Sequence, residues 1–187
     1  YRSALEGLEN RWEAEWNKVL HACTEAQRLV FCGTGKSGYV ARKLTATAHG
    51  LGISAAFLSP AEALHGDLGM LQKGDVLVAI SNSGNGPEWQ ALLESAHFLS
   101  FPMLALLGSD QGALARHAQW MFDCKVAREA DSSNLSPSTS TLVAQVCGEC
   151  LLYALAEHRQ FDASAFAKIH PGGQLGRKLH VKVSDVM

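Results

Sequence analysis

Two short turns in this 187-residue chain are rich in glycine and hydroxyl residues, and each directly follows an apolar run. One is GTGKSG at residues 33–38; the other is SNSG at residues 81–84, which leads into Pro87 and Glu88. Backbone N–H groups and hydroxyls at the start of a helix suit an anion, above all a phosphate. The candidate phosphate-binding residues of the two turns are Gly35, Ser37, Ser81, Asn82, Ser83 and Gly84. A capped helix with an acidic first turn explains the second turn equally well.

The first turn also fits the G-x-G-x-x-G spacing of a dinucleotide-binding turn. Such a turn is followed about 20 residues later by an acidic residue at the end of the next strand. Here Glu62 lies beyond Pro60, which weakens the nucleotide interpretation. Lys36 is a candidate to hold a sugar hydroxyl, a phosphate or a developing oxyanion, and a solvated loop lysine is the competing interpretation.

Candidate acid–base residues lie in three further segments. His65 lies in LHGDLGM and His170 precedes Pro-Gly-Gly; a histidine, with an ordinary pKa of about 6.5, is the natural proton carrier at neutral pH. Glu129 precedes a hydroxyl-rich segment in which Ser138 and Thr139 open a long helical pattern. Exposed loop histidines and a capped helix are the alternatives. Together these groups would supply an anion site with acid–base residues.

Short continuous apolar runs alternate with helical patterns along the chain. The expected strands begin at residue 28 and cover 53–58, 75–81, 102–108 and 120–124. The expected helices cover 3–24, a stretch ending at 51, 87–100, a short piece around 112–118, 138–158 and 162–168, while 59–71 is irregular or a short helix. This order is typical of an α/β fold whose parallel sheet is covered on both faces. Ligands of such sheets bind beyond the carboxyl ends of the strands, where both turns fall.

Composition narrows the class of protein. Hydrophobic residues make up 47% of the chain and charged residues 18%, with a formal net charge of −2 and no basic run, so a nucleic-acid partner is not expected. No apolar run approaches the roughly 20 residues of a membrane span. The chain has five cysteines, and the C-x-x-C of Cys147 and Cys150 lies in a helical pattern without a second pair. Helix packing in a reduced, cytoplasmic protein is therefore expected rather than a metal site.

Four strings, GTGKSGYVARKLTATAHGLG, PAEALHGDLGML, DVLVAISNSG and HPGGQLGRKLHVKVSDVM, resemble the sugar isomerase (SIS) domain of bacterial D-arabinose 5-phosphate isomerases. The likeness runs in the same order from about residue 28 to the end. It implies a five-stranded parallel sheet between helices, a flavodoxin-like three-layer sandwich. It also implies a SIS domain over residues 1–176 and a linker over 177–187 into a pair of cystathionine-β-synthase-type (CBS) domains that the chain lacks.

The resemblance implies an activity as well: interconversion of D-ribulose 5-phosphate and D-arabinose 5-phosphate through an enediol, a step toward the lipopolysaccharide sugar Kdo. It implies no metal or organic cofactor and a homotetramer with sites at subunit boundaries.

The family's catalytic positions fall on Lys36, Glu88, Glu129 and His170. We expect Glu129 to be the base, His170 the ring-opening or oxygen-proton acid and Lys36 the electrostatic stabiliser. Glu88 would orient the substrate or Lys36. His65 is a further candidate acid, and His170 could serve a neighbouring subunit.

Three positions depart from the family pattern. Gly86 stands where a second hydroxyl residue is common in the phosphate loop, and Asp131 and Asn134 stand where cysteine and glycine are usual. Two other functions therefore stay open beside the isomerase. One is a non-catalytic module that senses sugar phosphates; the other is a SIS isomerase for another sugar phosphate, such as a 6-phospho-3-hexuloisomerase.

Overall fold

The computed structural model describes residues 1–172, and a parallel sheet lies at its centre. The strands are β1 (Arg28–Gly33), β2 (Ala55–Leu58), β3 (Asp75–Ser81), β4 (Met103–Leu107) and β5 (Trp120–Asp123). They lie in the order β2-β1-β3-β4-β5, and every neighbouring pair is parallel. β1, β3 and β4 are buried almost throughout, which explains why their sequences are continuous apolar runs. The predicted α/β fold with a five-stranded parallel sheet is confirmed.

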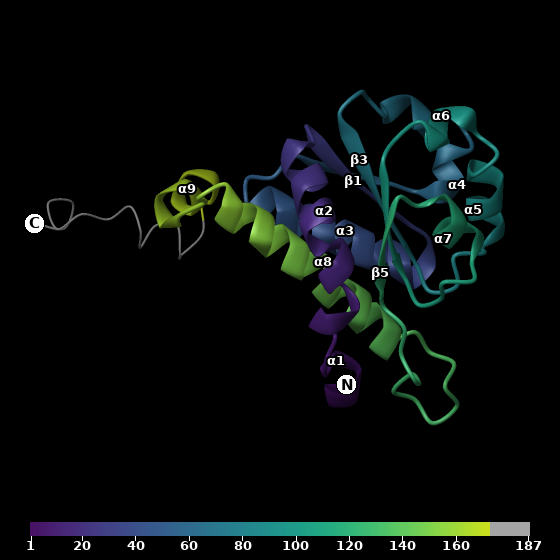
Figure 1. Cartoon of the computed structure of the whole chain (residues 1–187). Coiled ribbons are helices and arrows are strands. Elements are labelled where there is room, and N and C mark those ends of the chain that lie inside the picture. The colour runs from purple at the N-terminus through teal and green to yellow at the C-terminus, as the bar shows by residue number, and fades with distance from the viewer. Residues whose placement is uncertain (173–187) are drawn as a thin grey trace, which may run out of the picture.

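Helices cover both faces of the sheet (Figure 1). They are α1 (Arg2–Leu5), α2 (Glu13–Glu25), α3 (Gly35–Gly50), α4 (Pro60–Ala63), α5 (Pro87–Leu92), α6 (Ala96–Leu99), α7 (Ala113–His117), α8 (Thr139–His158) and α9 (Ala163–Ile169). Two 3₁₀ turns, η1 (Glu9–Arg11) and η2 (Asp67–Met70), join them. Residues of α2, α3 and α8 share one hydrophobic cluster, and residues of α4, α5, α6 and α7 share the other. The result is the predicted three-layer arrangement.

The central strand shows how the sequence divides between these layers. Val76, Val78 and Ile80 of β3 belong to the cluster with α3 and α8, whereas Leu77 and Ala79 belong to the cluster with α5 and α7. Successive side chains of a strand point to opposite faces, so one apolar run supplies both layers. Helices therefore pack against both faces of the sheet, and this packing also holds the carboxyl ends of the strands in place.

The predicted helix over residues 3–24 was wrong in its first half. Gly7 has φ +68, a left-handed conformation that interrupts the helix, and α2 starts at Glu13. The apolar spacing before α2 remains useful, because Leu8 and Trp12 are still buried in the cluster with α8. Helical spacing therefore marked the buried face correctly but did not show the break.

The predicted helix over residues 87–100 is also interrupted. α5 ends at Leu92, and α6 starts after Ser95, whose hydroxyl accepts a hydrogen bond from the Phe98 N–H at 3.3 Å. A serine that accepts from a backbone N–H two or three residues later begins a new helix. The predicted linker, residues 177–187, lies outside the described residues.

α8 is the longest helix of residues 1–172, and its burial explains its apolar sequence. By length and composition it could cross a membrane, with a mean hydropathy of 1.3, but 56% of that stretch is buried inside the protein. Cys147 is buried there, with its Sγ 3.3 Å from the Sγ of Cys124 at the end of β5, whereas Cys150 is exposed. Helix packing is thus confirmed for Cys147 and was wrong for Cys150. Within residues 1–172, no group of three metal-binding side chains is assembled.

Candidate active site

The turn after β1 is held against its strand by direct backbone contact. A Cβ on Gly33 would lie 2.9 Å from the Ser37 carbonyl oxygen, and a Cβ on Gly38 would lie 2.8 Å from the Gly33 carbonyl oxygen. Gly35 opens α3 with φ +52, a conformation that favours glycine. Lys36 is the next residue and is exposed. The closely packed turn therefore holds the Lys36 backbone in place while the ammonium group of its side chain reaches solvent.

The turn after β3 keeps hydroxyl protons available for a ligand. The Ser81 hydroxyl accepts a hydrogen bond from the Gly84 N–H at 3.0 Å, and the Ser83 hydroxyl accepts one from the Asn85 N–H at 3.3 Å. Gly84 has φ +65, and the turn packs so closely that a Cβ on Gly112 would lie 2.3 Å from the Ser83 carbonyl oxygen. A hydroxyl can donate while it accepts, so both serines can still donate to an anion.

The two turns meet where the strand order changes direction. From β1 the chain first adds β2 on one side and then β3 on the other, and open parallel sheets bind ligands at such a point. A cavity of about 120 Å³ lies here. It is lined by Thr34, Lys36, Ser37, Val40, Ile80, Ser81, Asn82, Leu106, Gly108, Cys124, Pro137, Ser140, Thr141 and Ala144. Lys36 and Ser37 of the first predicted turn thus line one cavity with Ser81 and Asn82 of the second.

Glu129 lies between β5 and α8 and is held by the first residues of the helix. Its Oε2 accepts hydrogen bonds from the Ser138 N–H at 2.9 Å, the Ser138 hydroxyl at 3.2 Å and the Ser140 N–H at 3.2 Å. Its Oε1 accepts a short hydrogen bond from the Ser140 hydroxyl. Burial acts to raise the pKa of Glu129, but these hydrogen bonds outweigh it, so the pKa lies below its ordinary value. The carboxylate is therefore ionised at neutral pH.

The hydroxyl residues at the start of α8 differ from one another in their surroundings. Ser138 lines a second cavity together with Lys36. The Ser138 hydroxyl donates to Glu129 and also accepts from the Ala130 N–H at 2.9 Å. Thr139 is buried. The sequence nominated both as phosphate ligands, whereas Ser140, which it did not nominate singly, lines the cavity and contacts Glu129. The hydroxyl run at residues 138–141 was the available signal, but sequence cannot tell which hydroxyl faces the carboxylate.

Glu88 lies on the other side of the first turn. With Gly35, Arg42 and Ser59 it lines a separate cavity of about 320 Å³. Thr34 lines both cavities, so the turn that bears Lys36 forms the wall between them. Glu88 is half-buried in the first turn of α5. Within one chain, Glu88 and Lys36 therefore line different cavities.

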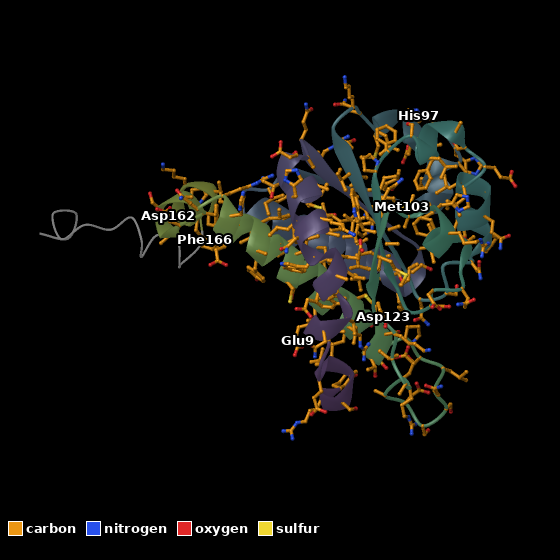
Figure 2. All side chains as sticks on the ribbon, viewed as in Figure 1. Glu9, His97, Met103, Asp123, Asp162 and Phe166 are labelled. Carbon is orange, nitrogen blue, oxygen red and sulfur yellow. The ribbon has the colours of Figure 1, made fainter. Side chains whose placement is uncertain are left out.

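His170 is remote from the cavity of its own chain. It ends α9, where its Nδ1 lies 2.9 Å from the Phe166 carbonyl oxygen and its ring stacks on Phe166 at 3.8 Å. A Cβ on Gly50, the last residue of α3, would lie 3.7 Å from the His170 Nε2. Lys36 lies at the opposite end of α3, about 21 Å away at 1.5 Å per residue. Figure 2 likewise shows Phe166 far from Asp123, the residue that ends β5 next to the cavity.

His65 does not line the cavity that contains Lys36. It is exposed in the turn between α4 and η2, where its backbone N–H donates to the Glu62 carbonyl at 2.9 Å. The structure therefore brings Lys36, Ser37, Ser81 and Asn82 together with Ser140, whose hydroxyl contacts Glu129. Glu129 itself does not line this cavity, and neither do Gly35, Ser83 and Gly84. The structure also leaves His65, His170 and Glu88 outside that cavity of the single chain.

A family model described as SIS domain matches residues 23–154. The chain belongs to the SIS domain family. A curated relative, Arabinose 5-phosphate isomerase KdsD of Pseudomonas aeruginosa, is 45% identical over 187 residues, which cover 100% of this chain and 57% of the relative. The protein of the same name from Escherichia coli strain K12 is 43% identical over 160 residues, which cover 86% of this chain and 49% of the relative. This SIS domain thus spans about half the length of these curated relatives.

A solved structure shares both fold and sequence with this SIS domain. It is c3406 of E. coli CFT073 in complex with arabinose 5-phosphate, with a TM-score of 0.82 and 34% identity. The match covers 91% of this chain and 93% of that chain. The two chains therefore share one architecture over nearly their whole lengths.

The departures of this SIS domain from the family pattern have a local structural explanation. Asn134 has φ 56, the left-handed conformation for which glycine is the usual residue and asparagine a tolerated one. Its side-chain oxygen accepts a hydrogen bond from the Glu129 N–H at 2.5 Å. The Asp131 carboxylate accepts from the Leu135 N–H at 3.2 Å and the Ser136 N–H at 3.0 Å. Both substitutions therefore add hydrogen bonds inside the loop that carries Glu129.

Proposed function

We propose that this SIS domain is an aldose–ketose isomerase that interconverts D-ribulose 5-phosphate and D-arabinose 5-phosphate. The observation that carries the proposal is the cavity at the β1–β3 switch point, where Lys36 and the turn hydroxyls adjoin Ser140, the partner of Glu129. Relatives named as arabinose 5-phosphate isomerases, aligned over most or all of this chain, support the choice of substrate. A structural neighbour in complex with arabinose 5-phosphate supports it further.

The phosphate binds at the turn formed by residues 81–84 in this proposal. Ser81 and Ser83 keep hydroxyl protons that they can donate to the phosphate oxygens. Ser37 adds a third hydroxyl from the start of α3. A phosphate dianion gains charge-assisted hydrogen bonds from such donors, which anchor one end of the sugar. The reacting carbons then lie toward Lys36 and Glu129.

Isomerisation moves one carbon-bound proton and one oxygen-bound proton. Glu129 removes the proton from C2 of the open-chain aldose, the enediol forms, and a proton returns to C1 to give the ketose. Lys36 stabilises the negative charge that develops on the oxygens. Its ammonium has one described contact among residues 1–172, the Tyr39 ring at 5.8 Å from Nζ to the ring centre, so it can turn to a ligand.

A neighbouring copy supplies His170 in this proposal. Because His170 lies at the far end of α3 from Lys36, it cannot reach the cavity of its own chain. Its Nδ1 faces the Phe166 carbonyl oxygen, so a neutral ring would donate there and keep Nε2 for exchange of an oxygen-bound proton. A homotetramer with sites between copies accommodates this placement, and Glu88 and His65 then orient or protonate substrate from the same boundary.

The cellular role follows from the proposed reaction. The product serves the Kdo branch of lipopolysaccharide synthesis in the cytoplasm, and a CBS domain pair follows residue 176 in the whole protein. The five cysteines are all free thiols, in keeping with a reducing compartment.

A direct assay with D-arabinose 5-phosphate tests the proposal, scoring formation of ribulose 5-phosphate. Glucose 6-phosphate and ribose 5-phosphate serve as alternative substrates, and Glu129→Gln as the inactive reference. We expect turnover confined to arabinose 5-phosphate and lowered about 100-fold or more in Glu129→Gln. Absence of turnover in a protein that a sugar phosphate still stabilises thermally would instead identify a sensor. Turnover of another sugar phosphate would identify a different SIS isomerase.

A further inference from the structure

The two oxygens of the Glu129 carboxylate have unequal partners. Oε2 accepts three hydrogen bonds, two from backbone N–H groups and one from the Ser138 hydroxyl. Oε1 accepts one described hydrogen bond, from the Ser140 hydroxyl. A carboxylate offers about four lone-pair positions in all. Oε2 is thus saturated, and Oε1 is the oxygen that retains capacity for an incoming proton.

Ser140 lies between this oxygen and the cavity. Ser140 lines the cavity together with Lys36 and Ser81, whereas Glu129 does not, and Ser140 is only 6% exposed. It belongs to the first turn of α8, a helix whose body is packed in the core, so its position is fixed by the fold. The Ser140 hydroxyl therefore connects Oε1 to the space in which a substrate would lie.

We infer that Ser140 is a positioning residue for the base: its hydroxyl fixes Oε1 as the proton-accepting oxygen of Glu129 and aims it at the cavity. This inference rests on the proposed isomerase function. It gives Ser140 a role distinct from phosphate binding, because the single hydroxyl proton is donated to Glu129 while the carboxylate is ionised. When Oε1 takes up the substrate proton, the Ser140 oxygen can accept that hydrogen in turn.

Two charged residues near Glu129 in the sequence, Arg128 and Asp131, are engaged by the backbone of the same loop. Arg128 directs its guanidinium to the backbone carbonyls of Glu129 and Asp131 rather than to the carboxylate. The Asp131 carboxylate is engaged by backbone N–H groups of its own loop. Lys36 also lines the cavity, and no ion pair joins it to Glu129 among residues 1–172. The direct partners of the Glu129 carboxylate within residues 1–172 are thus the donors of Ser138 and Ser140.

Kinetics of Ser140→Ala test the inference. We expect kcat to fall roughly 10- to 100-fold, the scale of one charge-assisted hydrogen bond, with little change in KM. The acid limb of the kcat/KM profile should move to higher pH, because loss of a donor to the carboxylate raises its pKa. Ser140→Ala should cause no further loss in a Glu129→Gln background, since both changes disable the same step.

Ser95→Ala is the matched control, because the Ser95 hydroxyl also begins a helix and Ser95 does not line the cavity. It should lower the melting temperature without lowering kcat. An unchanged kcat in Ser140→Ala would overturn the inference. So would an equal loss of kcat in Ser95→Ala, or the same fold-loss with and without Glu129→Gln, which would mean that Ser140 acts on the substrate directly.

A measurement without substrate separates this inference from the proposed function. Carboxyl ¹³C NMR of glutamate-labelled protein follows the titration of Glu129 in the wild type and in Ser140→Ala. A higher pKa in the variant supports the contact even if no isomerase turnover is found, and an unchanged pKa overturns it even in an active enzyme.

Discussion

Gly86 immediately precedes α5 and has a backbone that suits other residues. It has φ −57 and ψ 150, which any residue adopts, and a Cβ there would lie 3.2 Å from Glu88 Oε2, the mobile end of a side chain. The SIS pattern commonly has a hydroxyl residue at this position of the phosphate loop. The glycine therefore removes a donor without being required by the backbone.

We predict that Gly86→Ser lowers the KM for D-arabinose 5-phosphate. A serine hydroxyl donated to a phosphate contributes about 1.5–3 kcal/mol, which corresponds to roughly tenfold or more in affinity. Gly86→Ala is the control, because it adds the Cβ without the hydroxyl. Steady-state kinetics of the two variants decide the matter: equal KM values would place residue 86 out of reach of the phosphate.

The hydrogen bonds to Glu129 also predict how stability depends on pH. They hold the pKa of Glu129 below its ordinary value of 4.5, although burial opposes them. A carboxylate with a lowered folded-state pKa contributes stability that is complete above its unfolded-state pKa and disappears as pH falls through the folded-state pKa. The difference in melting temperature between the wild type and Glu129→Gln should thus be largest near neutral pH and shrink on acidification.

Glu94→Gln provides the comparison for that experiment, since Glu94 is exposed and its carboxylate has no described hydrogen bond. Its melting temperature should track the wild type throughout. A gap for Glu129→Gln that stays constant down to pH 3 or so would mean that the four donors do not favour the ionised form.

The loop between β5 and α8 is closed by its own side chains, which makes it a second support for Glu129. Asn134, with φ 56, holds the Glu129 N–H, and Asp131 holds the N–H groups of Leu135 and Ser136. We predict that Asn134→Ala is less stable to urea than Asn134→Gly by about 1 kcal/mol, because alanine is strained in the left-handed region. Both variants lose the side-chain hydrogen bond, so their difference isolates the backbone. Equal stabilities would show that the loop adopts another conformation at no cost.

The positions of the strands could be predicted from the sequence, whereas two breaks in the helices could not. The three central strands, β1, β3 and β4, are continuous apolar runs because both of their faces are buried. The edge strands β2 and β5 are only partly buried but are still short, largely apolar runs. The breaks at Gly7 and Ser95 were not predicted, because helical spacing continues across them while a left-handed glycine or a capping serine ends the hydrogen-bond pattern.

The candidate site also contains residues that the sequence predicts and contacts that it does not predict. Lys36, Ser37, Ser81 and Asn82 were predicted together because parallel strands present their ends at one edge of the sheet. The link between Glu129 and Ser140 depends on how the loop before α8 folds back onto that helix, and the position of His170 depends on where α9 packs. Sequence spacing contains neither piece of information.

Mixing two inactive variants in one oligomer tests whether His170 acts in the active site of a neighbouring copy. We predict that Lys36→Ala and His170→Ala, each inactive alone, regain activity when co-expressed. A mixed site can combine Lys36 from one copy with His170 from another, which would restore up to about a quarter of the sites under random mixing of a symmetric oligomer. Specific activity of the purified mixture measures the recovery.

The pair Lys36→Ala with Glu129→Gln is the control for complementation. Both residues serve the site of their own chain, so mixing these variants should restore nothing. Recovery in the control, or none in the test pair, would mean that His170 does not cross between copies.

The single helix α3 separates Lys36 from His170 in each copy. Lys36 lies at the start of α3, and Gly50, at its end, lies beside His170. In the proposed assembly each copy therefore takes part in two reaction centres, one through each end of this helix. A chain defective in both residues would silence its own centre and that of its neighbour. Produced in excess inside a cell, such a chain would act as a dominant inhibitor of the normal protein without competing for its substrate.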